Sequence, residues 1–171
     1  ARTVPDTTDY RGLSMFLAEK TPGTDEQPWQ DPGISGGEIE VLGYRGMKEY
    51  DISFDGFAVP AANLLGGEEG QGFKQLMQTF ESARIQTAAR AVGVMQAAFD
   101  QALAYSSRRT TFGKPIGDYQ LTKVKLARMA ALLATGRQFT YTVGRMMDQG
   151  KGQLEANMVK LFTCKSAEWL T

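Results

Sequence analysis

The chain has 171 residues, of which 42% are hydrophobic and 22% are charged, and this composition predicts a packed protein rather than a disordered one. Its 19 basic and 19 acidic side chains balance, which argues against a nucleic-acid binder, because such a protein needs an excess of cations. Histidine is absent and Cys164 is the single cysteine, so zinc sites, internal disulfides and Ser–His or Cys–His catalytic pairs are excluded and a reducing compartment is expected. No apolar run has the length of a membrane span, so none is expected.

Short strands separated by turns are predicted before residue 63. They cover LSMFLAEK at residues 13–20, EIEVLGY at residues 38–44 and YDISFDGFAV at residues 50–59. In the third strand, Ile52 and Phe54 alternate with polar residues, which is typical of a half-buried strand. Asp55-Gly56 indicates a turn or bulge, and Pro60 ends the run.

The segment between the first two predicted strands is rich in turn residues. Residues 21–37 contain three prolines and four glycines, and this composition predicts a long surface loop. Long loops in compact domains tend to be either functional or flexible, and the sequence leaves both interpretations open.

Three helices are predicted after Gly72. Apolar residues recur at steps of three and four from Phe73 to Leu103, which predicts one helix over residues 72–108, about 50 Å long. A second apolar stripe runs from Leu121 to Met146, and a third helix begins near Leu154. Gly150 and Gly152 are predicted to be C-caps of the second helix.

These elements predict an α+β fold in two parts. Residues 1–62 are interpreted as strands from the end of an antiparallel β domain, and residues 63–171 as the first helices of an up-and-down bundle. The chain begins at Ala1 without an initiator methionine, and Thr171 lies inside a helical pattern. We therefore expect a fold that is incomplete at both ends.

The run GGEEGQG at residues 66–72 has a glycine-rich composition that invites comparison with a dinucleotide-binding loop. Its spacing is not G-x-G-x-x-G, and no crossover helix of a parallel sheet follows it. We interpret it as a flexible turn before the long helix, with Glu68 and Glu69 in solvent near the positive end of the helix dipole.

The run FESAR at residues 80–84 places Glu81 and Arg84 three positions apart on the predicted long helix. One interpretation is a surface salt bridge, worth about 0.2–0.5 kcal/mol. The other is a charged pair at the rim of a ligand pocket.

The connection RRTTFGKPIGDYQ at residues 108–120 has an unusual composition for a link between two helices. Arg108 and Arg109 in a last helical turn suit the helix dipole, but Thr111, Phe112 and Gln120 have no such explanation. The arginines supply a bidentate phosphate donor, and the other three residues supply a hydroxyl, a flat ring and a carboxamide. Pro115 and Gly113 are expected to shape the turn. A loop for a phosphate-bearing ligand and an ordinary helix end both remain open at this point.

Several runs together resemble the acyl-CoA dehydrogenase family. RRTTFGKPIGDYQLTKVKLARMA is similar to a signature of that family, and FDGFAVPAANLLGGEEGQGF is similar to its crossover into the helical domain. FESARIQTAARAVGVMQAAFDQALAYSSRR resembles the family's long first C-terminal helix, and ART with GLSMFLAEKTPG resembles its late β-domain strands. The segment GTDEQPWQDPGISGGEIEVLGYRGMKEY is longer than usual and resembles the branch that oxidises methylsuccinyl-CoA.

The resemblance implies an FAD-dependent enzyme that converts an acyl-CoA thioester into a 2,3-enoyl-CoA and passes electrons to an electron-transfer flavoprotein. It implies a homo-oligomer, a dimer or a dimer of dimers, in which the turn reaches a neighbouring subunit's FAD. By this match the FAD ligands are Arg109, Thr111, Phe112 and Gln120, with Thr110 and Tyr119 adjacent to them. Glu81 and Arg84 correspond to residues along the CoA channel, and Thr3 corresponds to a CoA-contacting position.

No catalytic residue is assigned. The family's usual glutamate base follows the third helix of the bundle, and some members carry the base directly before the helix arginine, where this chain has Ala83. Two alternatives remain, a relative with monooxygenase or nitroalkane-oxidising chemistry and a non-catalytic subunit that completes a partner's FAD site. The expected location is the cytoplasm of a bacterium or, in a eukaryote, the mitochondrial matrix.

Overall fold

The computed structural model describes residues 1–43 and 45–171. They form two compact units, Ala1–Gln75 and Leu76–Thr171, which we describe separately. The strand predicted over residues 38–44 ends at Tyr44, outside the described residues. The domain boundary after residue 62 stays a prediction.

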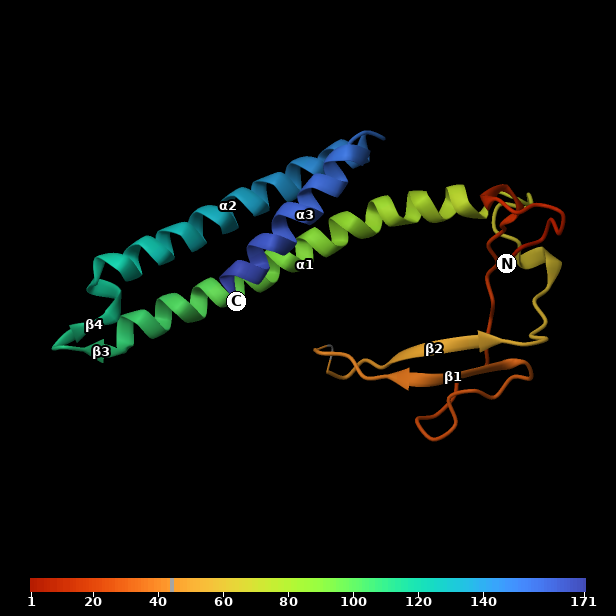
Figure 1. Cartoon of the computed structure of the whole chain (residues 1–171), viewed down its shortest axis with the longest axis horizontal. Coiled ribbons are helices and arrows are strands. Elements are labelled where there is room, and N and C mark those ends of the chain that lie inside the picture. Colours follow the sequence, from red (N-terminus) through yellow and green to blue (C-terminus); the bar gives the residue numbers. More distant parts are fainter. Residues whose placement is uncertain (44) are drawn as a thin grey trace. The chain divides into compact units, whose positions relative to one another are not determined.

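The first unit contains one antiparallel hairpin, β1 (Ile34–Ile39) and β2 (Glu49–Phe54), in which Ile34 pairs with Phe54 and Ile39 with Glu49 (Figure 1). Two 3₁₀ turns, η1 (Tyr10–Gly12) and η2 (Ala61–Asn63), lie before and after it in the chain. A bend at Asp55-Gly56 follows β2, as predicted, with Gly56 at φ +70°.

Two strand predictions in this unit need correction. Residues 13–20 form isolated bridges at Leu13 and Phe16 instead of a strand, because a strand needs a continuous partner and these positions meet only single residues, Arg2 and Leu64. The central strand over residues 38–44 is also displaced, since β1 ends at Ile39. Ile52 and Phe54 are exposed rather than half-buried, because the rings beside them, Trp29 near Ile52 and Phe57 near Phe54, cover them only in part.

The loop predicted over residues 21–37 ends at residue 33, because residues 34–37 pair with β2 as part of β1. Residues 21–33 are held by specific contacts. The backbone amide and hydroxyl of Thr21 donate to the Asp31 carboxylate at 2.6 and 2.7 Å, which closes the loop at its base. The Trp29 indole N–H donates to the Gly36 carbonyl at 2.9 Å, and its ring meets Tyr50 edge-on at 5.4 Å. These contacts dock the loop on the β1–β2 hairpin.

The three helices match the predicted periodicity closely. They are α1 (Gly72–Arg108), α2 (Gln120–Asp148) and α3 (Gln153–Leu170). Gly150 ends α2 at φ +70°, with its N–H bonded to the Met147 carbonyl and the Lys151 N–H bonded to Met146. Gly152 was wrongly predicted as a C-cap, because at φ +91° it is the residue from which α3 starts.

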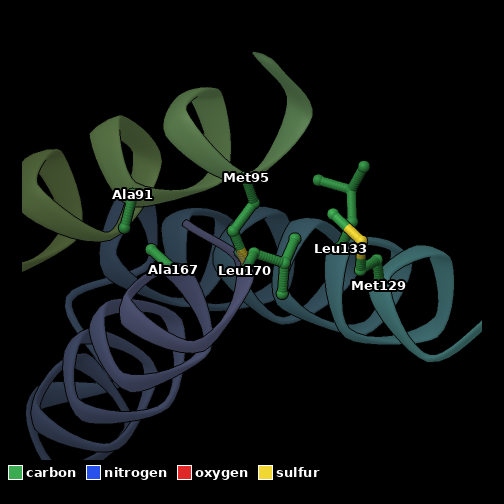
Figure 2. Close-up of a cluster of buried hydrophobic side chains, with 6 residues drawn as sticks. All are labelled: Ala91, Met95, Met129, Leu133, Ala167 and Leu170. Carbon is green, nitrogen blue, oxygen red and sulfur yellow. The ribbon is translucent and has the colours of Figure 1, made fainter. Parts of the chain in front are cut away.

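The core of the second unit lies where the three helices meet. Figure 2 shows six buried side chains that pack there, two from each helix: Ala91, Met95, Met129, Leu133, Ala167 and Leu170. A second cluster of buried residues continues along the bundle with Ala88, Val143, Ala156 and Val159. These contacts explain why apolar positions at three- and four-residue spacing become helices: only a helix brings them onto one face.

Many large apolar side chains of α1, α2 and α3 remain exposed in this chain, among them Phe80, Leu103, Leu121, Leu161 and Trp169. Among the described residues, no helix combines the length and the hydropathy needed to cross a membrane. The residues between Arg108 and Gln120 connect α1 to α2 at one end of the bundle (Figure 1).

Candidate functional site

The connection between α1 and α2 is a small β-hairpin rather than a plain loop. Strands β3 (Thr110–Thr111) and β4 (Lys114–Pro115) pair antiparallel, with Thr110 opposite Pro115 and Thr111 opposite Lys114. The hairpin lies at the shared end of α1 and α2 (Figure 1). The sequence did not predict it, because two-residue strands carry no readable alternation.

Phe112 and Gly113 form the two-residue turn of this hairpin. Their φ angles are +52° and +81°, the left-handed pair that a tight hairpin requires. Glycine adopts this conformation freely, but for phenylalanine it costs about 1–2 kcal/mol. The Phe112 side chain is 95% exposed. An aromatic ring is thus held in solvent by a strained backbone, which is an arrangement typical of a binding residue.

The two arginines beside the hairpin differ in their surroundings. The Arg108 Nε donates to the Ala104 carbonyl at 3.2 Å, so this guanidinium ends α1 as the helix-capping interpretation expects. Arg109 is exposed, and within residues 1–43 and 45–171 its guanidinium has no hydrogen-bond or ion-pair partner. Its backbone is fixed instead, because its N–H donates to Tyr105 at 2.9 Å and its carbonyl accepts from Ile116 at 2.7 Å.

Tyr119 lies directly before α2 and points back to the hairpin. Its hydroxyl donates to the Thr111 carbonyl at 2.7 Å. The Lys114 ammonium lies 4.3 Å from the centroid of the Tyr119 ring, within range of a cation–π contact. Lys114 was not singled out from the sequence, since its partner is known only once the hairpin register is known.

Gln120 is the first residue of α2 and is exposed. Residues 108–120 hold three cations and one carboxylate, Asp118, so the hairpin has a positive potential. The unpaired guanidinium, the hydroxyls of Thr110 and Thr111, the exposed ring and the carboxamide are therefore brought together at one end of the bundle. This donor set suits a diphosphate joined to a flat ring.

Glu81 and Arg84 lie elsewhere, on the middle of α1. Both are half-buried, and in the described part of the chain no ion pair joins them, so the simple salt-bridge interpretation is not supported. At 1.5 Å per residue, Arg84 lies about 36 Å along the helix from Arg108. Glu81 and Arg84 therefore cannot contact the same end of a ligand that the hairpin residues contact.

Thr3 belongs to the first unit and is half-buried. Its hydroxyl shares a hydrogen bond of 2.7 Å with the hydroxyl of the buried Ser14. It also lines an apolar hollow of about 640 Å³ with Phe16, Phe54 and Phe57.

The glycine-rich run at residues 66–72 forms a turn, with Gly66, Gly67 and Gly70 at positive φ and with Glu68 and Glu69 exposed, in agreement with its interpretation.

Comparison with known proteins identifies relatives across the whole chain. Residues 70–171 match the protein family described as "Acyl-CoA dehydrogenase, C-terminal domain". The chain is 60% identical over 168 residues to (2S)-methylsuccinyl-CoA dehydrogenase of Cereibacter sphaeroides, a match that covers 98% of this chain and 31% of that protein. The chain therefore spans about a third of the length of this curated relative.

Solved structures agree with this result. An acyl-CoA dehydrogenase from Geobacillus kaustophilus superposes with a TM-score of 0.86 at 30% identity, covering 99% of this chain and 43% of that one. A structure of PigA with FAD and proline superposes with a TM-score of 0.83 at 27% identity, covering 98% of this chain and 41% of that one. The α+β arrangement of a β segment followed by long helices is thus shared with these proteins.

Proposed function

This chain belongs to the acyl-CoA dehydrogenase family, and we propose that it forms part of an FAD-dependent enzyme that oxidises an acyl-CoA thioester to a 2,3-enoyl-CoA. Electrons would leave through an electron-transfer flavoprotein. The observation that carries the proposal is the hairpin turn: an exposed aromatic ring at Phe112 in a left-handed conformation, beside the unpaired Arg109 guanidinium.

The residues of the hairpin fit FAD. A diphosphate needs charge-assisted donors, and Arg109 offers a planar guanidinium with no partner in the described residues. An adenosine needs a flat surface and hydrogen-bonding groups, which Phe112, Thr111 and Gln120 supply. FAD, when bound, supplies the two-electron acceptor that no side chain of this chain provides. Arg109, Thr110, Thr111, Phe112 and Gln120 would hold it by its diphosphate and adenosine.

The position of the hairpin supports contact with a second subunit. The β3–β4 hairpin lies beyond the ends of α1 and α2 (Figure 1), and Phe112 in its turn is 95% exposed in this chain. We propose that the full protein is a dimer or a dimer of dimers in which this turn binds the neighbouring subunit's FAD. The exposed apolar side chains of the three helices provide surface for such contacts.

The residues proposed for substrate binding are Glu81 and Arg84 in the second unit and, separately, Thr3 in the first. A half-buried guanidinium without a carboxylate partner at Glu81 is available to a phosphate or a carbonyl oxygen of a CoA thioester. The separation of about 36 Å between Arg84 and the hairpin fits one protomer that holds its own substrate and a neighbour's cofactor. We assign no catalytic base, because Ala83 has no acidic group and Glu81 lies two positions away.

The proposed substrate class is supported by the 60% identical relative, whose name is (2S)-methylsuccinyl-CoA dehydrogenase. We propose a branched dicarboxylic acyl-CoA as substrate. We also propose that residues 1–62 are the end of a β domain and residues 63–171 the start of a helical domain. The proposed location is the bacterial cytoplasm or the mitochondrial matrix.

The test of the proposed function is Phe112→Ala in the full-length protein. We expect a folded oligomer that purifies with markedly less flavin, measured as flavin absorbance per protomer after gel filtration. Leu42→Ala is a matched control, because Leu42 is also fully exposed and lies in the other unit. Full flavin content in Phe112→Ala would show that the turn is structural.

A further inference from the structure

The Phe112–Gly113 turn has a geometry that its own two strands are too short to maintain. Each strand has two residues, and even longer isolated hairpins are only marginally stable in water. The positive φ of Phe112 adds a further cost, because the side chain of a residue other than glycine crowds its own backbone there. Something outside β3 and β4 must therefore hold the turn.

The base of the hairpin is fastened to the end of α1. The Ile116 N–H donates to the Arg109 carbonyl at 2.7 Å, which closes the hairpin below its strands. Gly117 lies against the buried Ser106, so closely that a Cβ atom at Gly117 would lie 3.1 Å from the Ser106 carbonyl oxygen. These contacts fix where the hairpin starts, but they do not reach the turn.

Tyr119 is the residue that reaches the turn from outside the strands. Its hydroxyl bonds to the Thr111 carbonyl, and its ring faces the Lys114 ammonium. Thr111 and Lys114 are opposite each other in the hairpin and directly flank Phe112–Gly113. One side chain therefore contacts both strands at the last residue before the turn.

The position of Tyr119 in the chain is also unusual. It is the N-cap of α2, where Ser, Thr, Asp or Asn would accept a hydrogen bond from the first helical turn. Tyr119 makes no such bond, and its hydroxyl is used by the hairpin instead. Functional sites often contain a residue that departs from the local preference of its position, and here the N-cap residue makes a contact with the hairpin instead of capping α2.

We propose that Tyr119 is a positioning residue, which together with Lys114 holds the Phe112–Gly113 turn in its binding geometry before FAD arrives. This inference rests on the proposed function and changes the role that the family resemblance gives Tyr119, from a group beside FAD to a support of the group that binds FAD. A preformed turn loses less conformational entropy on binding than a mobile one, so the support raises affinity without touching the ligand.

Hydrogen exchange of the FAD-free full-length protein measures the support directly. Tyr119→Phe removes the hydroxyl and keeps the ring, and we expect amide exchange over residues 109–116 to become faster while α2 and α3 are unchanged. FAD binding to the same variant should weaken about 3- to 10-fold, which corresponds to the loss of one hydrogen bond. Tyr105→Phe is the matched control, since Tyr105 is an exposed tyrosine one turn before the hairpin, and it should change neither quantity.

A double-mutant cycle separates support from direct contact. If Tyr119 acts through Phe112, then Tyr119→Phe should have no further effect on FAD affinity in a Phe112→Ala background. Additive losses, or weaker FAD binding with unchanged exchange over residues 109–116, would mean a direct contact and would overturn the inference. Unchanged exchange and unchanged affinity would overturn it as well.

The outcome for Tyr119 is distinguishable from the outcome for the proposed function. If Phe112→Ala retains full flavin, the FAD proposal fails whatever Tyr119 does. Faster exchange over residues 109–116 in Tyr119→Phe would still support its role in holding the turn, and unchanged exchange would still overturn it.

Discussion

Gly136 of α2 lies directly against Met95 of α1, so that a Cβ atom at Gly136 would be 3.0 Å from the Met95 Cε atom. The same Cβ atom would be 3.3 Å from the Cγ2 atom of Thr163 in α3. Met95 and Thr163 are fully buried, and the Thr163 hydroxyl is bonded to the Val159 carbonyl at 2.7 Å. Gly136 therefore lies at a point where the three helices are closely packed, and a side chain there would require its neighbours to shift.

Substitutions at two glycines of α2 should differ in their effect on stability. Gly144→Ala should raise stability by up to about 1 kcal/mol, because alanine favours the helix and nothing lies within 4 Å of the new atom. Gly136→Ala makes the same gain but overpacks the core, so it should be less stable than Gly144→Ala by about 1–3 kcal/mol. Thermal unfolding of the two variants measures the difference, and equal midpoints would contradict this account of the core.

Arg109 should bind flavin in a way that its neighbour Arg108 does not. Losing a hydrogen bond to a charged group weakens binding by about 10- to 150-fold, so Arg109→Ala should give folded protein with little FAD. Arg109→Lys should restore only part of it, since an ammonium keeps the charge but not the planar pair of donors. Arg108→Ala is the matched control, because its guanidinium is bonded to the Ala104 carbonyl. Equal flavin content in all three variants would refute the assignment.

Arg84 should affect the substrate and leave the flavin in place. Arg84→Ala is expected to lower kcat/KM for the acyl-CoA thioester by about 10- to 150-fold, with normal FAD content. Ser82→Ala, at an exposed position two residues before, should leave the kinetics unchanged. If Arg84→Ala has wild-type kinetics, the FESAR run has no role in substrate binding.

The loop closed by Thr21 and Asp31 should open in acid. Hydrogen bonds from the Thr21 hydroxyl and amide lower the pKa of the Asp31 carboxyl below its ordinary value of 3.8. The pKa of Asp31 is lower in the folded state than in the unfolded state. The stabilisation of the loop by the Thr21–Asp31 hydrogen bonds is therefore fully present above about pH 3.8 and is lost as the pH falls through the lowered pKa. Asp31→Asn should imitate the protonated state at neutral pH.

Trypsin cleavage after Lys20 reports on the same loop, because the Lys20 ammonium is bonded to the Thr21 and Pro28 carbonyls at 3.1 Å. Cleavage should be faster in Asp31→Asn than in the wild type, whereas Asp6→Asn, an exposed carboxylate outside the loop, should have no effect. Identical cleavage rates for Asp31→Asn and the wild type would show that the Thr21–Asp31 hydrogen bonds do not hold the loop.

The full-length protein should be an oligomer. A hairpin that exposes 95% of Phe112, together with exposed Phe80 and Leu121 on the helices, needs a partner surface. Sedimentation velocity at micromolar concentration is expected to show a dimer or a tetramer. A monomer with FAD fully bound would rule out a turn that serves a neighbouring subunit.

The helical half of this protein could be predicted from local sequence patterns. Apolar residues at three- and four-residue spacing predicted α1 at its observed limits, Gly72 and Arg108, because helix periodicity is encoded in neighbouring residues. Gly150 was predicted as a C-cap on the same local grounds. The composition of residues 108–120 left two interpretations open, a loop for a phosphate-bearing ligand and an ordinary helix end.

The way in which the residues of this connection are held depends on contacts between segments that are not neighbours in sequence. The hairpin of β3 and β4, the left-handed Phe112 and the contacts of Tyr119 with Thr111 and Lys114 depend on a register that no local pattern encodes. The strand predicted over residues 13–20 failed for a related reason: apolar composition favours an extended chain, but a strand exists only where a second segment pairs with it. Periodicity is a property of neighbours in sequence, whereas strand pairing, positive φ at a bulky residue and side-chain support are decided by segments that meet in space.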